Sequence, residues 1–205
     1  MRCTPSLFLL LASAALAPTV AAAQVVPVER DGEVLVVLET PLGRIDLAID
    51  TVAAPVTGAN FLRYVDAGLY GGGTFYRVVT PDNQPDDEVR IEVIQGGMNR
   101  ALRDEAFAPI LLESTSTTGL HHLDGTLSMA RGDPDSARAE FFICIGDQPE
   151  LDEGGARNAD GRGFAAFGRV IGGMDIVRAI QAHPAEGQYL IDRVPIVAAV
   201  RGGAS

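Results

Sequence analysis

An arginine inside an apolar, β-branched run is the first candidate for chemistry in this sequence. Arg77 lies within residues 74–79 (TFYRVV). A guanidinium stays protonated and resists full burial, so we expect this side chain to face a water-accessible groove. A second polar break, Gln95, interrupts residues 93–97 (VIQGG), and residues 141–143 (FFI) supply aromatic surface. The alternative is that these are three ordinary strands, with Arg77 at an edge or in a structural ion pair.

Three other polar features could suggest a metal site or a catalytic triad, but their patterns do not favour either. Adjacent side chains on an extended segment point to opposite faces, so His121 and His122 are interpreted as a solvated pair rather than a zinc site. Ser128 lacks the Gly-x-Ser-x-Gly elbow of many serine hydrolases, which argues against a catalytic triad. Residues 152–163 hold several acids without the spacing of a calcium loop, so a solvated loop is favoured. We expect no metal and no cofactor.

The basic residues exclude two further classes of function, amine-dependent catalysis and nucleic-acid binding. All 16 are arginine and none is lysine, which rules out chemistry that needs an amine, such as Schiff-base formation. With 27 acids the formal net charge is -11, and no cluster of arginines forms a basic stripe. We therefore expect no nucleic-acid partner.

The first residues are typical of a secretory signal peptide. Arg2 supplies a positive charge, residues 7–17 are apolar or small, and Ala21, Ala22 and Ala23 precede Gln24. We predict a signal peptide over residues 1–23, a mature N-terminal segment over 24–33 and one domain over 34–203. The mature chain is expected in the periplasm or outside the cell, with no membrane contact after cleavage and as a monomer.

The rest of the chain has the pattern of a β-rich domain. Its 23 glycines and 12 prolines are spread throughout, which favours short strands joined by turns. Four-residue spacing predicts a helix over residues 57–69, capped by Thr57, and three-residue spacing predicts another over 174–182. Strands are predicted over residues 34–39, 44–49, 74–79, 90–94, 125–130, 140–145, 165–170 and 189–199. Strands without alternating helices favour a closed barrel capped by helices.

Five motifs, in this order, resemble the cyclophilin-type peptidyl-prolyl cis-trans isomerases. They are FYRVV at 75–79, IQGG at 94–97, GTLSMA at 125–130, EFFIC at 140–144 and FGRV at 167–170 with Gly173 and Met174. The similarity runs from about residue 34 to residue 200. It implies a mainly β fold, an eight-stranded closed antiparallel β-barrel capped by two α-helices, with the site in a groove on the outer wall and without metal or cofactor.

The resemblance also implies roles for individual residues. Arg77 matches the family's catalytic arginine, and Gln95 matches the glutamine that holds the substrate carbonyl and orients the arginine. The other positions that it implies for substrate binding are Phe75, Val93, Ala130, Arg131, Glu140, Phe142, Leu151 and Phe164. Among these, Phe142 and Leu151 match the walls of the proline pocket.

Several positions depart from the family pattern. Glu92 stands where a phenylalanine is common, Glu140 replaces a glutamine, Phe164 replaces a histidine and Glu150 replaces a tryptophan. Glu140 could pair with Arg77 and either preorganise it or tie it up. Between Arg77 and Gln95 the chain also carries an insertion over residues 80–90, whose acids are expected near the groove.

These features predict an exported isomerase that acts on X-Pro bonds of folding polypeptides. The main rival, motivated by Glu92 and Glu140, is a weakly active or inactive peptide-binding or chaperone module on the same fold. A barrel that binds a small ligand in its interior is weaker, because the predicted inward residues Val36, Leu38 and Ile45 leave no polar set to line a cavity.

Overall fold

The computed structural model describes Met1 and residues 30–202. Apart from Met1, the predicted signal peptide over residues 1–23 lies outside the described residues. The same holds for most of the predicted segment 24–33 and for residue 203.

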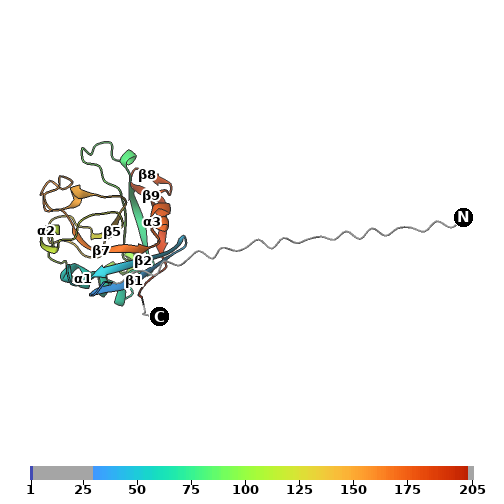
Figure 1. Cartoon of the computed structure of the whole chain (residues 1–205), viewed down its shortest axis with the longest axis horizontal. Helices are drawn as coiled ribbons and strands as arrows, with labels where there is room; N and C mark the ends of the chain where they lie inside the picture. The colour runs from blue at the N-terminus through green and yellow to red at the C-terminus, as the bar shows by residue number, and fades with distance from the viewer. Residues whose placement is uncertain (2–29, 203–205) are drawn as a thin grey trace.

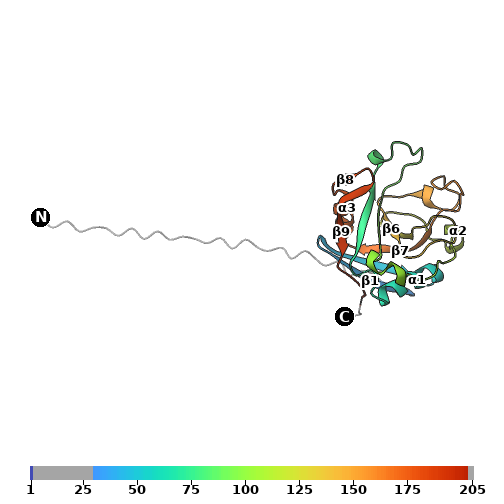
Figure 2. The same cartoon turned by 180° about the vertical axis from the view of Figure 1, so that it is seen from behind.

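The described chain is built on one antiparallel sheet (Figure 1, Figure 2). Its ten strands follow the order β10-β1-β2-β7-β5-β6-β4-β3-β9-β8. They are β1 (Glu33–Thr40), β2 (Gly43–Asp50), β3 (Gly73–Val79), β4 (Val93–Gly97), β5 (Thr126–Met129), β6 (Phe141–Cys144), β7 (Ala165–Gly172), β8 (Ala185–Glu186), β9 (Tyr189–Ile196) and β10 (Ala198–Arg201). The mainly β prediction is confirmed.

The sheet differs from the predicted closed barrel of eight strands, which is not confirmed. Among the described residues no ladder of hydrogen bonds joins its edge strands β8 and β10. The single strand predicted over residues 189–199 is divided at Val197 into β9, which pairs with β3, and β10, which pairs with β1. The chain thus passes from β9 beside β3 to β10 beside β1 through one residue, and the Val197 N–H donates to the Glu39 carbonyl of β1 at 2.8 Å. Strand β8 has only two residues, too few for a pattern to predict it.

Helices cover this sheet at two places. Helix α1 (Pro55–Asp66) packs on β2, β7 and β10, and α3 (Met174–Gln181) packs on β2, β3 and β4. Both were predicted, α1 with boundaries displaced toward the N-terminus. The short α2 (Thr115–Thr118) and three 3₁₀ turns, η1 (Pro81–Asn83), η2 (Arg100–Glu105) and η3 (Pro149–Leu151), complete the described elements.

The predicted cap of the first helix is wrong. The helix starts at Pro55, two residues before Thr57, and its N-cap residue Ala54 makes no side-chain cap. Glu113 takes that role from far along the sequence, since its carboxylate accepts from the backbone N–H groups of Val56 and Thr57 at 3.0 and 2.6 Å. A carboxylate at a helix N-terminus satisfies free N–H groups and complements the helix dipole.

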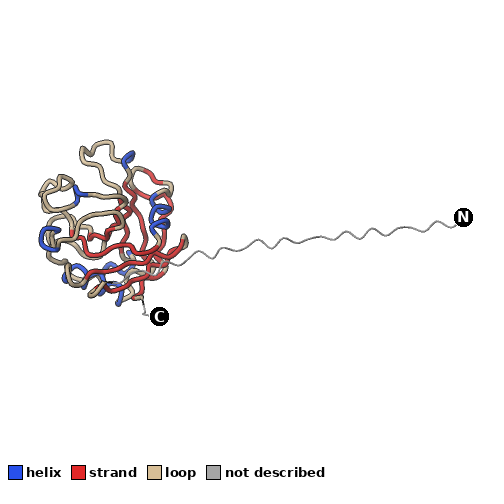
Figure 3. The backbone as a smooth tube through the Cα atoms, viewed as in Figure 1, coloured by secondary structure: helices blue, strands red, loops and turns tan. Residues whose placement is uncertain are grey.

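Alternation along the strands divides their apolar side chains between two clusters. On β6, Phe141 and Ile143 enter the large interior core, whereas Phe142 and Cys144 enter a small cluster on the outer face. The outer cluster also contains Val79, Ile91, Val93 and Leu151. The long loops lie on the side of the molecule away from α3 (Figure 3). The fold thus supplies an apolar floor outside its core.

A β-bulge at Tyr76 directs the side chains of β3. Phe75 pairs with Gly96 and Arg77 pairs with Gln95, so Tyr76 is an extra residue, and the pairing with β9 shifts at the same place. Phe75 is fully buried in the interior core, whereas Tyr76 and Arg77 are only partly buried. The bulge re-aims Arg77, which simple alternation would place on the same face as Phe75.

Candidate functional site

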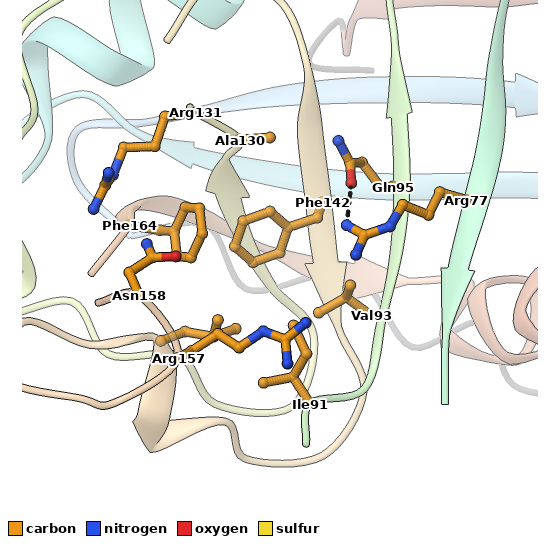
Figure 4. A pocket seen from close by; sticks show the side chains of 11 residues that line it. Arg77, Ile91, Val93, Gln95, Ala130, Arg131, Phe142, Arg157, Asn158 and Phe164 are labelled. Atoms are coloured by element: carbon orange, nitrogen blue, oxygen red, sulfur yellow. Dashed lines mark hydrogen bonds between the residues drawn. The ribbon is translucent and has the colours of Figure 1, made fainter. Parts of the chain in front are cut away.

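A pocket of about 210 Å³ lies over the outer apolar cluster (Figure 4). Strands β3, β4 and β6, the turn η3 and the loops after β5 and before β7 supply its walls. Its lining residues are Arg77, Ile91, Val93, Gln95, Ala130, Arg131, Phe142, Leu151, Arg157, Asn158 and Phe164. Eight of the ten residues predicted for the site therefore lie together. The predictions of a groove outside the barrel and of Arg77 facing it are consistent with this position.

The guanidinium of Arg77 is held on two edges by amide oxygens. Its NH1 donates to Oε1 of Gln95 at 2.8 Å, and its Nε donates to Oε1 of Gln188 at 2.9 Å. Its NH2 also donates to that oxygen of Gln188. Burial lowers the pKa of Arg77, but an arginine remains protonated in proteins. Figure 4 shows the guanidinium turned toward the ring of Phe142.

This bonding leaves part of the donor capacity of Arg77 free. A guanidinium carries five N–H groups, and the described contacts use one on Nε, one on NH1 and one on NH2. One N–H on each terminal nitrogen makes no hydrogen bond within the described residues. Since Arg77 lines the pocket, these two groups are available to a molecule that occupies it.

Gln95 is itself held in one orientation. Its Oε1 accepts from Arg77, and its Nε2 donates to the Tyr76 hydroxyl at 2.8 Å. Because Tyr76 is the extra residue of the bulge and Arg77 follows it, both can reach the same glutamine on β4. Burial, followed by the nearby Glu140 carboxylate, raises the pKa of Tyr76, so its hydroxyl stays neutral.

Phe142 forms the apolar floor of the pocket. Its ring stacks on His122, with centroids 6.0 Å apart and planes 15° apart, and meets Phe164 edge-on with centroids 5.2 Å apart. Val93 and Leu151 pack in the same outer cluster. Aromatic surface held on both sides in this way suits a flat apolar ring such as that of proline.

Arg131 stabilises the pocket wall opposite Arg77 by binding the loop before β7. Its NH1 and NH2 donate to the two carboxylate oxygens of Asp160 at 2.8 and 2.9 Å, and its Nε donates to the Gly163 carbonyl. This side chain is 2% exposed, and its guanidinium lies 5.3 Å from the Phe164 ring centroid. The hydrogen bonds from Arg131 lower the pKa of Asp160 to about 2. Arg131 therefore serves the structure of the wall, and the neighbouring Ala130 is the freer of the two to contact substrate.

Two loops meet at the rim of the pocket. Arg157, in the loop before β7, donates to the Val89 carbonyl at 2.6 Å and lies 3.1 Å from the Asp87 carboxylate. Gln84 closes the insertion at its base, because its side chain bonds the carbonyl groups of Thr80 and Ile91. Arg157, Asn158, Ile91 and Gln188 are the site residues that the sequence reasoning missed. The available signals were the insertion just before Ile91 and the polar loop over residues 152–163, which contains Arg157 and Asn158; no pattern indicated Gln188.

Two predicted site residues lie outside the pocket. Phe75 is 0% exposed in the interior core, which corrects its predicted contact with substrate. Glu140 lies against Gly97, on the face of β4 that also carries Gln95, and one of its carboxylate oxygens is buried without a hydrogen bond. Burial raises the pKa of Glu140, while Tyr76 and Arg100 lower it. Glu140 makes no ion pair with Arg77.

Glu92 also differs from its predicted position. It accepts a hydrogen bond from Gln181 of α3 at 3.3 Å and does not line the pocket. Ile91 occupies the pocket wall instead. Glu92 and Glu140 motivated the hypothesis of a weakly active protein, but neither lies beside the free N–H groups of Arg77.

His122 is buried rather than solvated, which corrects the interpretation of the histidine pair. It is 1% exposed, with Nδ1 bonded to Asp152 at 2.6 Å and Nε2 bonded to Ser128 at 2.9 Å. Burial lowers the pKa of His122, so its ring is neutral. This order of groups resembles a catalytic triad, but Ser128 is 0% exposed and no substrate reaches it. His121, on the outside, bonds the other oxygen of Asp152.

Within residues 30–202, no group of three histidines, cysteines or acids is arranged to hold a metal ion. No helix of this described part is long and apolar enough to cross a membrane. The one cysteine here, Cys144, is buried, and burial raises the pKa of its thiol.

Comparison with known proteins matches this arrangement to one family. Residues 35–201 match the family model described as cyclophilin-type peptidyl-prolyl cis-trans isomerase. Peptidyl-prolyl cis-trans isomerase A of Dickeya dadantii is 35% identical over 161 residues, which cover 78% of this chain and 77% of that protein. A peptidyl-prolyl cis-trans isomerase of Acinetobacter baylyi is 34% identical over 163 residues, 78% of this chain and 79% of that protein.

A solved structure supports the fold. The cyclophilin-type isomerase of Cryptosporidium parvum, crystallised in the presence of the dipeptide Ala-Pro, superposes with a TM-score of 0.67. The superposition covers 83% of this chain and 99% of the other, at 20% sequence identity.

Proposed function

The chain belongs to the cyclophilin-type peptidyl-prolyl cis-trans isomerases, and from that premise we propose that Arg77 catalyses X-Pro rotation by hydrogen bonding to the proline nitrogen. The substrate proline would lie on Phe142, Val93 and Leu151. The free N–H groups of Arg77 would then face its ring nitrogen.

Catalysis of X-Pro rotation requires a hydrogen-bond donor that acts only on the twisted peptide bond. The peptide C–N bond has partial double-bond character, and rotation meets a barrier of about 20 kcal/mol. When the bond is twisted, the proline nitrogen becomes pyramidal and its lone pair can accept a hydrogen bond. A donor aimed at that lone pair stabilises the transition state and not the planar substrate, which is the condition for a faster reaction.

The observation that carries this proposal is that only some of the N–H groups of Arg77 are hydrogen-bonded within the described residues. Three of its N–H groups are fixed by Gln95 and Gln188, and two remain free beside an apolar floor. Such preorganised donors need no rearrangement when the lone pair appears. The step involves no proton transfer, so a cation that is protonated at every relevant pH is suited to it.

One hydrogen bond does not supply the whole acceleration. A charge-assisted bond contributes about 1.5 to 3 kcal/mol, equivalent to roughly one to two decades in rate. The apolar floor adds to the acceleration by holding the proline ring away from water. There the planar amide loses hydrogen bonds to water that would otherwise stabilise it. Gln95 would bind the carbonyl of the residue before proline while it orients Arg77.

We further propose that the substrates are polypeptides that fold outside the cytoplasm. The support is the N-terminal sequence, with Arg2 before an apolar run and small residues at 21–23. Expression of the full chain in a bacterium, followed by fractionation and N-terminal sequencing, tests the export. We expect a periplasmic product that begins at Gln24, whereas an uncleaved cytoplasmic product would contradict it.

The activity is tested by exchange spectroscopy on a short Ala-Pro peptide. We expect substoichiometric protein to broaden the separate cis and trans resonances, because exchange becomes fast relative to their separation. Binding shifts without broadening would instead indicate a peptide-binding module. Glu92 and Glu140 lie away from the pocket lining, which supports the catalytic reading.

A further inference from the structure

Gln188 connects the catalytic arginine to the insertion over residues 80–90. It stands between β8 and β9, after Gly187, whose positive φ of 58° makes the turn. Its backbone carbonyl accepts from the Val78 N–H at 2.9 Å, which fixes the turn against β3. The side chain of Gln188 is partly buried and accepts a hydrogen bond from Arg77, which also lies on β3.

Gln188 engages the side of the guanidinium that Gln95 does not. Its Oε1 accepts from Nε and from NH2 of Arg77, whereas Gln95 accepts from NH1. A single hydrogen bond leaves a guanidinium free to turn about that bond. Two acceptors on different edges fix its plane, and with it the direction of the remaining N–H groups.

Asn83, in the insertion, holds this turn and the glutamine in place. Its Nδ2 donates to the carbonyl groups of Val78 and Gly187 at 3.0 and 3.1 Å. Its Oδ1 accepts from the Thr80 N–H at 2.9 Å. The Asn83 carbonyl in turn accepts from Nε2 of Gln188 at 3.3 Å, which leaves the oxygen of that amide facing Arg77.

We propose that Gln188 is a positioning residue for Arg77 and that the insertion acts on catalysis by orienting Gln188 through Asn83. This inference rests on the proposed role of Arg77. It gives the insertion a task in the reaction: residue 83 fixes an amide, the amide fixes a guanidinium, and the guanidinium presents two N–H groups to the proline nitrogen.

The first test is kinetic. We expect Gln188→Ala to lower kcat for a proline peptide about 10-fold at nearly unchanged KM, because small misplacements of a catalytic group are costly. Asn83→Ala should give a smaller loss of the same kind. Gln188→Glu keeps an acceptor for Arg77 but loses the donor to the Asn83 carbonyl, so it should recover only part of the rate.

Two comparisons separate positioning from general damage. Gln181→Ala removes a partly buried glutamine that bonds Val79 and Glu92 without touching Arg77, and it should leave kcat within about 2-fold. In an Arg77→Ala background, Gln188→Ala should cause no further loss, since it acts through the missing side chain. An additional 10-fold loss in that background would overturn the proposal.

The second test is independent of turnover. The Nε–H of Arg77 donates to Gln188, so in wild-type protein its ¹⁵N-resolved proton should exchange slowly with water, and Gln188→Ala should speed that exchange at least several-fold. Unchanged exchange overturns the inference about geometry. A wild type without isomerase activity overturns the proposed function instead, and the role of Gln188 in catalysis falls with it. An active wild type with a fully active Gln188→Ala overturns the positioning role alone.

Discussion

Arg77 and Gln95 are direct partners across two strands, with NH1 of the arginine 2.8 Å from Oε1 of the glutamine. The amide also donates to the Tyr76 hydroxyl, which fixes which end of the amide faces the arginine. The polar part of the pocket is therefore preorganised before substrate arrives, and the expected consequences can be measured residue by residue.

Removal of the guanidinium should slow isomerisation strongly. We expect Arg77→Ala to lower kcat/KM by about 10- to 100-fold, the value of one charge-assisted hydrogen bond to the transition state. Arg77→Lys should recover little, because an ammonium lacks the planar fork that Gln95 and Gln188 hold. A protease-coupled assay measures both variants, and full activity of Arg77→Ala would exclude the assigned mechanism.

Glu140→Gln should leave catalysis nearly unchanged and stabilise the protein. The carboxylate is largely buried with one oxygen unbonded, and it makes no contact with Arg77. Replacement of a poorly solvated charge by a neutral amide should raise the free energy of unfolding at pH 7 by about 1 kcal/mol. Urea denaturation and the peptide assay check this, with Glu92→Gln as the control near α3. A change in kcat above about 5-fold would show that Glu140 does act on Arg77.

Stability should fall on acidification because of His122. Burial lowers the pKa of this histidine below its usual 6.5, so the unfolded chain binds the proton at a higher pH than the folded one. The contribution of the neutral ring is therefore complete above that pH and is lost as the pH falls toward the lower folded pKa.

Thermal unfolding at pH 7.5, 6.5 and 5.5 measures this dependence. The melting temperature of the wild type should drop over this range, and His122→Gln should flatten the curve while lowering its plateau. His183→Gln, at the end of α3 and outside this cluster, serves as the matched control. An equal slope in wild type and His122→Gln would assign the pH dependence to other groups.

Asp87→Asn should loosen the insertion without unfolding the domain. Its carboxylate lies 3.1 Å from Arg157 and is 41% exposed, so the pair contributes less than about 1 kcal/mol. Its larger effect should be local, on the segment that contains Arg90. We expect trypsin to cleave after Arg90 several-fold faster in Asp87→Asn than in wild type. Asp86→Asn is the control, and equal cleavage in all three proteins would show that the Asp87 carboxylate does not restrain the loop.

The sequence predicts the strands and the pair Arg77 and Gln95 because their signals are local. Apolar or alternating runs mark most of the strands, and a guanidinium in such a run is rare enough to indicate a groove. The same reasoning fails at Phe75, since alternation places it beside Arg77 on one face and a bulge has no pattern of its own.

Other features of the site depend on contacts between distant segments. Gln188 reaches Arg77 across 111 positions, and Glu113 caps a helix 56 positions away. His122 is buried by the packing of Phe142, which two adjacent histidines do not reveal. Tertiary pairing decides such positions, and residue type and spacing carry no information about it.

The extra residue at position 76 separates the register of this strand from its hydrogen bonding. Deletion of Tyr76 would leave Phe75 opposite Gly96 and Arg77 opposite Gln95, and regular alternation would still place these two neighbours on opposite faces. The strand would lose the hydroxyl that accepts from Gln95 and fixes the amide of that glutamine. Loss of one codon would therefore preserve the direction of the arginine while it frees the glutamine beside it.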